Sequence, residues 1–149
     1  MQPLTYALRF RGSVQRVGID GNVLKTTTAA AGCAIQTRIG VDGVRGVLRT
    51  VVGQEASCEA DLVFTGTTTF QQTGTIVFGT GGHQLRFSSI GSGHLGPTQE
   101  SNHRHGAAIW RVDGGEGQFA NATGLIVSNF VVSDAGEITD HQLGVVFMR

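Results

Sequence analysis

The sequence alternates apolar and polar side chains over short segments, a period of two residues that is typical of β-strands with one buried face. Near the start of the chain, the alternating apolar residues are Leu4, Tyr6, Leu8 and Phe10. In the middle, Cys58, Ala60, Leu62 and Phe64 alternate with Ser57, Glu59, Asp61 and Val63. No stretch long enough for a stable helix carries the period of an amphipathic helix. We therefore predict an all-β chain with little helix.

Glycine-rich turns separate the predicted strands, at Asp20-Gly21, Asp42-Gly43, 79–82 and 134–136. Gly91–Arg104 is the longest predicted loop. Thr26–Gln36 is predicted as a strand or an irregular segment, because threonine is β-branched and Gly32 interrupts the run. Strands at this spacing favour one domain over residues 1–149, a single closed antiparallel β-barrel of about eight strands, with a sandwich as the alternative. The interior of such a barrel holds packed side chains or one small ligand.

The segment His105–Val132 predicts two strands joined by an elaborated turn. Two extended runs, Gly106–Val112 and Leu125–Val132, flank a glycine-rich connection. Phe119 is the one large apolar side chain in this connection, and we expect it to plug one end of the barrel. We expect Gly124 to permit a close approach of two backbones just before the second strand.

Composition and charge indicate which partners the chain can bind and in which cellular compartment it is expected. The 11 Lys and Arg balance the 11 Asp and Glu, so no overall field attracts nucleic acid or an anionic membrane, and we expect neither partner. The chain shows no secretory signal and no apolar run of the roughly 20 residues that a membrane span needs, so we expect a cytoplasmic protein. Cys33 and Cys58 lie outside any metal-ligand spacing and are expected to be free thiols.

The glycine-rich connection resembles a known family. The run Ala108–Thr123, with its Gly-Gly-x-Gly-x-Phe core, is followed by Gly124 and a hydrophobic strand. This pattern resembles the corner of the allene oxide cyclase and dirigent-type β-barrel superfamily, a calycin-like architecture, and Thr67–Leu95 looks like uncharacterised bacterial members of it. The resemblance implies a barrel with a central apolar cavity, dimers or trimers, and cofactor-free cyclisation or coupling of reactive hydrophobic intermediates. No catalytic residue of that superfamily maps onto a position of this chain, so the activity is a hypothesis.

Tyr6 and His141 are the first catalytic candidates, because each shares a strand face with apolar residues. Alternate residues of a strand, which have the same parity, lie on one face. The parity of His141 groups it with Leu143, Val145 and Phe147. If both side chains point into a cavity, pairing of the first and last strands brings them together. The hydroxyl would then orient a substrate oxygen while the imidazole moves a proton. The alternative is that each is a buried polar group satisfied by the backbone.

Glu59 and Asp61 share one strand face and form the second catalytic candidate. If that face points inward, one of them becomes the best general base in the chain. Arg86 would then be its counter-charge or an anchor for a substrate carboxylate. If the face points outward, both are ordinary solvated charges, which is the commoner location of carboxylates.

Three histidines near the longest predicted loop invite a metal site. His94, His103 and His105 have no cysteine nearby, and Glu100 is the only neighbouring carboxylate. Because metal sites need three or four converging ligands, we expect a solvated loop there, with neither a metal nor another cofactor.

Two functions compete for a barrel of this kind. The first is a cofactor-independent isomerase or cyclase acting on a small hydrophobic, oxygen-bearing substrate. Trp110, Phe87 and Phe130 would line its cavity, although the core is the simpler location for Trp110. The alternative is a non-catalytic carrier of a small hydrophobic ligand, as in lipocalin-like barrels. Ionisable groups inside the cavity favour the enzyme, a wholly apolar lining favours the carrier, and a completely filled interior favours a purely structural oligomer.

Two segments are apolar on both strand faces, Ile126–Val132 and Leu143–Phe147. A monomer would leave one of these faces in water, so we predict a homodimer or homotrimer.

Overall fold

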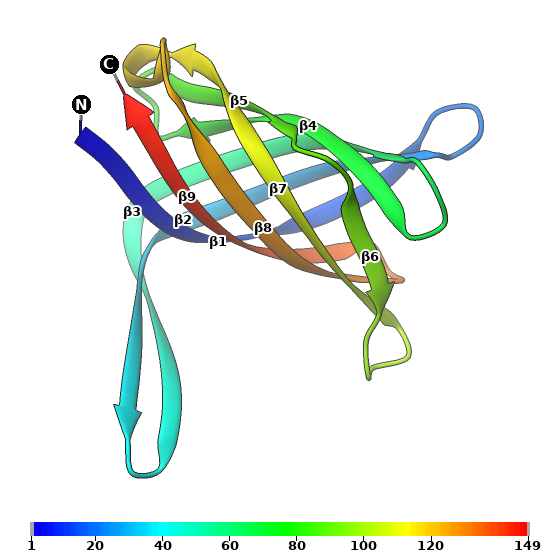
Figure 1. Ribbon diagram of the computed structural model, residues 1–149, viewed down its shortest axis with the longest axis horizontal. Helices are drawn as coiled ribbons and strands as arrows, with labels where there is room; N and C mark the ends of the chain where they lie inside the picture. The colour runs from blue at the N-terminus through cyan, green and yellow to red at the C-terminus, as the bar shows by residue number, and fades with distance from the viewer. Residues whose placement is uncertain (1, 149) are drawn as a thin grey trace.

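The computed structural model describes residues 2–148, which form nine β-strands and one short 3-10 helix (Figure 1). The strands are β1 (Gln2–Val17), β2 (Val23–Gly40), β3 (Gly43–Phe64), β4 (Thr69–Phe78), β5 (His83–Ser89), β6 (Gly93–Pro97), β7 (His103–Glu116), β8 (Thr123–Ser133) and β9 (Glu137–Met148). The short helix η1 (Gly117–Phe119) lies between β7 and β8. No helix within residues 2–148 is long and apolar enough to cross a membrane. The prediction of an all-β chain is confirmed.

The strands form one antiparallel sheet that closes in a ring (Figure 1). Their order is β3-β2-β1-β9-β8-β7-β5-β4-β6, and β3 also pairs with β4, which joins the two sides of the sheet. β5 and the short β6 both lie between β4 and β7. As predicted, the first and last strands pair, with Tyr6 opposite Gly144 and Arg9 opposite His141.

The prediction of a loop over the whole of Gly91–Arg104 is wrong in part. Gly93–Pro97 forms β6, which pairs with both β4 and β7. Leu95 of this strand is only 4% exposed, so β6 adds an apolar side chain to the core. Glycine and proline at both ends of the segment hide this short strand from a reading of the sequence pattern.

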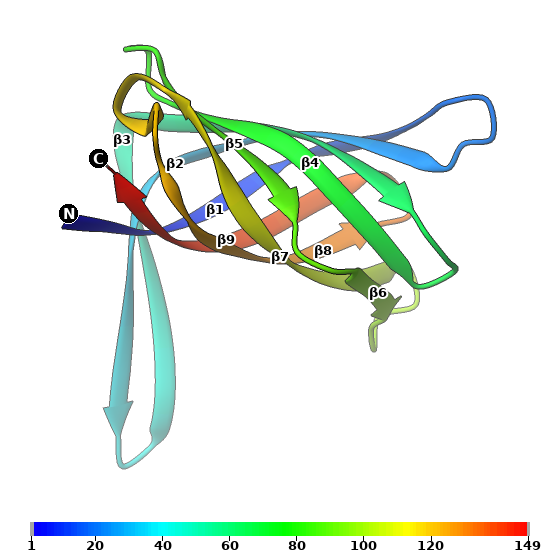
Figure 2. The same ribbon diagram turned by 45° about the horizontal axis from the view of Figure 1, so that its top comes forward.

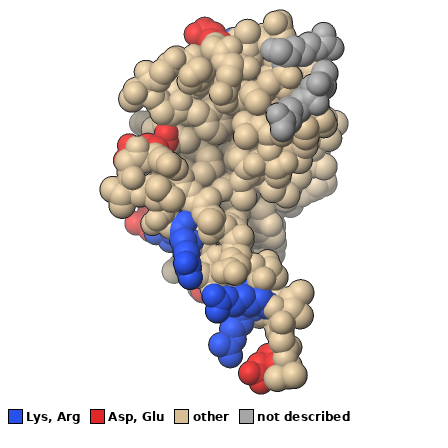
Figure 3. Space-filling model, turned by 90° about the vertical axis from the view of Figure 1, so that its left-hand side faces the viewer, with Lys and Arg blue, Asp and Glu red and all other residues tan. Residues whose placement is uncertain are grey.

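β2 and β3 continue beyond the ring as a two-stranded arm, residues 32–51 (Figures 1 and 2). A register shift between Ala31 and Gly32 marks the point where the paired strands leave the ring. On the other strand, Gly53 has a φ of 86°, a backbone conformation that favours glycine. Basic side chains gather along the arm (Figure 3). The sequence predicts the turn at Asp42-Gly43, but it does not predict that the flanking strands project from the ring.

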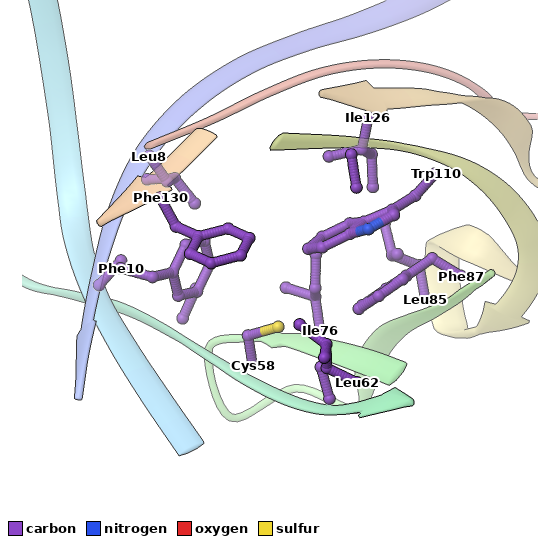
Figure 4. Close-up of a cluster of buried hydrophobic side chains, with 14 of the residues drawn as sticks. Leu8, Phe10, Cys58, Leu62, Ile76, Leu85, Phe87, Trp110, Ile126 and Phe130 are labelled. Atoms are coloured by element: carbon purple, nitrogen blue, oxygen red, sulfur yellow. The ribbon is translucent and has the colours of Figure 1, made fainter. Parts of the chain in front are cut away.

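Large apolar side chains form a packed cluster in the interior of the ring (Figure 4). Trp110 and Phe87 stack face to face, with ring centroids 3.9 Å apart and planes 12° apart. The indole Nε1 of Trp110 donates a hydrogen bond to Oε1 of Gln72 over 3.1 Å. The one polar atom of this stacked pair is therefore partnered, as buried polar groups usually are.

Four aromatic rings of the interior each lie over a glycine that is directly opposite on a neighbouring strand. The pairs are Tyr6 with Gly144, Phe70 with Gly93, Phe87 with Gly74 and Phe130 with Gly106. A Cβ atom built on any of these glycines would overlap the ring opposite. The pairing of an aromatic residue with a strand glycine keeps the sheet covered where glycine offers no side chain. Glycine within these strands thus makes room for the aromatic core.

The corner between β7 and β8 contributes Phe119 to the core of the ring. Phe119 is fully buried, as predicted, and its ring centroid lies 5.2 Å from that of Phe78. Tyr6 meets the other side of this cluster, edge-on to Phe78 at 5.6 Å. Gly124 has a φ of 142°, and a Cβ atom there would lie 2.9 Å from the Cα of Val146. The predicted close approach of two backbones at Gly124 is confirmed.

Candidate functional site

The wall of the ring is incomplete at the end where the arm leaves. β1 pairs with β9 over Gln2–Ser13, but it pairs with β2 only over Arg11–Val17. Residues 3–10 therefore have a neighbouring strand on one side only. The thiol of Cys33, at the base of the arm, donates to the carbonyl oxygen of Ala7 on this free edge over 3.1 Å.

A pocket of about 380 Å³ opens beside this free edge. Three apolar side chains form much of its wall, those of Leu8, Ala56 and Phe78. The remaining lining residues are Gly32, Gly53, Gln54, Glu55 and Gly79. A largely apolar pocket with few polar groups is the usual form of a site for a small hydrophobic molecule.

A chain of hydrogen-bonded polar side chains lies inside the ring. The Tyr6 hydroxyl donates to Oε1 of Gln142 over 3.4 Å, and Nε2 of Gln142 donates to Oδ2 of Asp140 over 2.9 Å. The other carboxyl oxygen of Asp140 accepts from the Ser128 hydroxyl over 2.7 Å and from the backbone N–H of Asn129 over 3.2 Å. Both oxygens of the Asp140 carboxyl group therefore have hydrogen-bond partners, which fix the orientation of this side chain.

Burial disfavours the charged forms of the titratable members of this cluster. Burial raises the pKa of Asp140, and the hydrogen bonds from Gln142 and Ser128 only partly oppose this shift. Burial also raises the pKa of Tyr6, with smaller contributions in the same direction from Cys58 and Asp140. The pKa of Cys58 is raised to about 12, again chiefly by burial. Tyr6 and Cys58 therefore stay protonated, and neither supplies a general base near neutral pH.

Packing connects the polar chain to the pocket. Leu8 lines the pocket and follows Tyr6 on the same face of β1. Phe78 also lines the pocket and packs against the edge of the Tyr6 ring. The Tyr6–Gln142–Asp140 chain thus begins directly behind the apolar wall of the pocket.

The structure separates the two catalytic candidates on the terminal strands. Tyr6 is on the inner face of β1, whereas His141 is exposed on the outer face of β9. The expectation that strand pairing brings both into one cavity is wrong, because the apolar residues that share the parity of His141 cover the outside of the ring. Tyr6 instead meets Gln142, the next residue along β9.

The carboxylate candidates also lie outside. Glu59, Asp61 and Arg86 are exposed on the outer face, and Thr75 lies opposite both Glu59 and Arg86 in the sheet. Asp61 and Arg86 line a shallow groove of about 370 Å³ together with Asp113. Of the two orientations, the outward, solvated one is observed, because the apolar alternate residues of β3 face the interior, and the catalytic role that required the inward face is wrong.

The predicted substrate contacts are core residues. Trp110 is 1% exposed, Phe87 2% and Phe130 3%, and none of them lines the pocket beside β1. Sequence reasoning missed Asp140 and Gln142, although both share the parity of Gly144, the glycine that accommodates Tyr6. An interior glycine opposite an aromatic residue is the signal that could have identified the inner face of β9.

The histidine-rich segment does not assemble a metal site. Within residues 2–148, no group of three or more His, Cys, Asp and Glu side chains converges to hold a metal ion. His103 pairs with Glu100, its Nδ1 lying 3.2 Å from a carboxylate oxygen, and His105 meets the side-chain oxygen of Asn129.

The raised pKa of Asp140 predicts a pH dependence of stability. A folded state that binds this proton more tightly than the unfolded state is favoured at low pH. The contribution is complete below the ordinary aspartate value of 3.8 and is lost as the pH rises through the raised value. We therefore expect the free energy of unfolding of the wild type, measured by urea denaturation relative to that of Asp140→Asn, to fall as the pH rises above about 4.

Asp113 provides a control of opposite sign. Burial alone would raise its pKa, but the hydrogen bonds from Ser88 and Arg111 outweigh this effect and lower it. Relative to Asp113→Asn, the wild type should therefore lose stability as the pH falls. If the difference in stability between the wild type and its asparagine variant changes with pH in the same way for Asp140 and Asp113, the raised pKa of the buried Asp140 is contradicted.

Comparisons with known proteins return no match: no family model, no curated protein and no solved structure is similar to this chain. The fold and the geometry of the site are therefore the whole basis for a function.

Proposed function

We propose that this protein is a cofactor-independent isomerase or cyclase that acts on a small hydrophobic, oxygen-bearing molecule. In this proposal the closed sheet is a calycin-like β-barrel, and the substrate occupies the pocket beside the free edge of β1. The observation that carries the proposal is the Tyr6–Gln142–Asp140 chain, a hydrogen-bonded polar path that ends behind an apolar pocket wall.

Tyr6 does not line the pocket, so in this proposal it meets a substrate oxygen that enters between Leu8 and Phe78, the two wall residues next to it. Its hydroxyl lies 3.4 Å from Gln142, longer than the common O–H···O distance of about 2.8 Å, so this hydrogen bond is weak and can be exchanged for one to a substrate oxygen. Because its pKa is raised, the hydroxyl stays protonated and donates to a carbonyl or enolate oxygen. Gln142 and Asp140 are positioning residues, since they act through Tyr6.

The pocket would supply the rest of the catalysis through shape. Leu8, Ala56 and Phe78 pack against the apolar part of the substrate and restrict its conformations. Holding a flexible molecule in a near-reactive conformation accelerates an intramolecular reaction without a cofactor.

A carrier of small hydrophobic ligands is the second candidate. It is favoured by the apolar pocket wall and by the hydrogen bonds that the interior polar groups already make with one another. In a carrier, the Tyr6 hydroxyl stabilises the fold and makes no contact with the ligand.

Ligand binding separates these two functions. The probe is diphenylhexatriene, a fluorescent hydrocarbon, and the competitor is a medium-chain methyl ketone that displaces it. Ala56→Phe fills the pocket and should abolish probe binding, whereas Thr27→Phe, on the exposed face of β2, should leave it unchanged. Probe binding that survives Ala56→Phe would place the ligand elsewhere and overturn the proposed pocket.

Tyr6→Phe tests the role of the hydroxyl. One neutral hydrogen bond is worth about 1 kcal/mol, so this variant should bind the ketone roughly fivefold more weakly while its affinity for the hydrocarbon is unchanged. Its free energy of unfolding should fall by only about 1 kcal/mol. Equal affinity of the wild type and Tyr6→Phe for the ketone would favour the carrier.

A further inference from the structure

The free edge of β1 is a feature that the proposed function leaves unexplained. Within residues 2–148, residues 3–10 pair with β9 on one side and with no strand on the other. Their inner side chains are covered less well than those farther along β1: Leu4 and Tyr6 are only partly buried, whereas Phe10 is fully buried. Proteins usually pair or cover a strand edge of this kind.

The register of β1 and β2 identifies a segment that fits this edge. The pairing of the two strands ends with Arg11 opposite Ala29. Continued by four residues in each strand, the same register places Cys33 opposite Ala7. The thiol of Cys33 donates to the carbonyl oxygen of Ala7 over 3.1 Å, so the first residues of the arm still lie close to the position that this register gives them. The segment that would complete the wall is therefore the start of the arm, residues 33–36.

The side chains of this segment match the inner face of β1. In the continued register, Gly32 comes opposite Leu8, and Ala34 comes opposite Tyr6. Gly32 and Ala34 have the parity of the β2 residues that face the interior. A small residue opposite a large inner side chain repeats the arrangement of Tyr6 and Gly144 on the other side of β1.

The junction between the arm and the ring has the features of a hinge. The register shift beside Gly32 leaves residues 52–54 of β3 without a partner on β2. Gly53, in the middle of this unpaired segment, has open space around its Cβ position, so packing does not fix its backbone. A few residues at the end of an element are enough to absorb the change in φ and ψ of a hinge. Gly32 and Gly53 both line the pocket, so the hinge lies at the pocket itself.

We infer that the arm is a lid of the pocket. It bends at Gly32 and Gly53, and residues 33–36 pair with residues 4–7 of β1, which completes the wall of the ring beside the pocket. In the structure the arm points away from the ring, and this is the open state through which a ligand enters (Figures 1 and 2). The inference rests on the proposed function, because it takes the pocket beside β1 as the site of the ligand.

Closing the lid changes the chemistry at the mouth of the pocket. Arg49 lies opposite Ala34 in the arm and shares its face, so a closed arm turns this guanidinium toward the pocket. A guanidinium there pairs with the oxygen of an oxygen-bearing substrate. Lids commonly complete a site in this way when they close. The other face of the arm is apolar and stays on the outside, with Ile35, Ile39, Val44 and Leu48.

An engineered disulfide tests the closed state. In the continued register Thr5 comes opposite Ile35, with Cα atoms about 4.5–5.5 Å apart, a separation that a disulfide spans. Thr5→Cys/Ile35→Cys, combined with Cys33→Ser to remove a competing thiol, should therefore form a crosslink within one chain on oxidation. Non-reducing electrophoresis and mass spectrometry of the peptides detect it.

Thr5→Cys/Leu48→Cys, also with Cys33→Ser, is the matched control. Leu48 lies opposite Ile35 on the same face but belongs to the next strand, so its Cα stays roughly 10 Å from that of Thr5 in the closed state, too far for a disulfide. This control should remain reduced. A Thr5→Cys/Ile35→Cys variant that does not crosslink, or one that crosslinks no faster than the control, would overturn the inference. A crosslink between two chains would overturn it in favour of pairing with the arm of a second copy.

Release of the bound probe tests whether the closed arm is a lid. With diphenylhexatriene in the pocket, the Thr5–Ile35 crosslink should slow its release by at least about tenfold, and dithiothreitol should restore the wild-type rate. If Ala56→Phe abolishes probe binding but the crosslink leaves the release rate unchanged, the pocket stands and the lid is wrong. Probe binding that survives Ala56→Phe would overturn the proposed pocket, whereas the crosslink would still support the closed arm.

Discussion

Trp110→Ala is expected to lower the free energy of unfolding by about 3–5 kcal/mol, the range for removing a large buried aromatic side chain. Trp110 is 1% exposed and stacks on Phe87, so the variant leaves a cavity in the centre of the ring. It also removes the donor to Oε1 of Gln72, which is itself buried. Since domains of this size are stable by about 5–15 kcal/mol, a large share of the total is lost.

Two comparisons make this prediction specific. Trp110→Phe keeps an aromatic ring but loses the indole N–H, so it should cost clearly less than the alanine variant. Val63→Ala shortens an apolar side chain that is 40% exposed on the outer face and should change stability by no more than about 0.5 kcal/mol. Trp110 is the only tryptophan, so unfolding is followed by circular dichroism. Equal losses for Trp110→Ala and Val63→Ala would contradict the assignment of Trp110 to the core.

The sequence predicted the strands whose two faces differ in chemistry. In β1, Leu8 and Phe10 alternate with charged residues, and both are buried as expected. In β3, the apolar set from Cys58 to Leu62 faces inward and the acidic set faces outward. Where one face of a strand is apolar and the other polar, burial has only one favourable outcome, so the pattern alone decides which side faces the core.

The orientation of β9 could not be predicted in the same way. Both faces of β9 carry apolar residues. Near the middle of the strand, the outer face has the large side chain of Leu143, whereas the inner face has Gly144, which has no side chain. Parity then assigns His141 and Gln142 to opposite faces without saying which face is buried. The same cause hid the polar chain in the interior, because Asp140 and Gln142 have the parity opposite to that of His141.

The arm was hidden for a different reason. Its strands are continuous with those of the ring, and the change occurs at the register shift beside Gly32 and at Gly53. Local sequence preferences report on strand and turn, and they contain no information on whether a third strand lies alongside. The apolar outer face of β8 and β9 and the apolar face of the arm are both surfaces that a single chain leaves uncovered. On both surfaces apolar residues are exposed, so a prediction that equates apolar residues with buried ones fails there.

Gly124→Ala is expected to destabilise the fold by about 3 kcal/mol, from backbone strain at a positive φ together with overpacking. Gly124 has a φ of 142°, and its Cβ atom would collide with the carbonyl oxygen of Val145 and lie 2.9 Å from the Cα of Val146. These are backbone atoms of a paired strand, so no rotation of a side chain relieves the clash, and β8 and β9 have to separate locally. Gly96→Ala is the matched control, because Gly96 is also a strand glycine but has open space around its Cβ position. That variant should be neutral or more stable by about 0.4–1 kcal/mol, since alanine restricts the unfolded chain. Urea denaturation measures both, and a Gly124→Ala variant as stable as Gly96→Ala would show that the corner does not need the close approach predicted from its glycine-rich sequence.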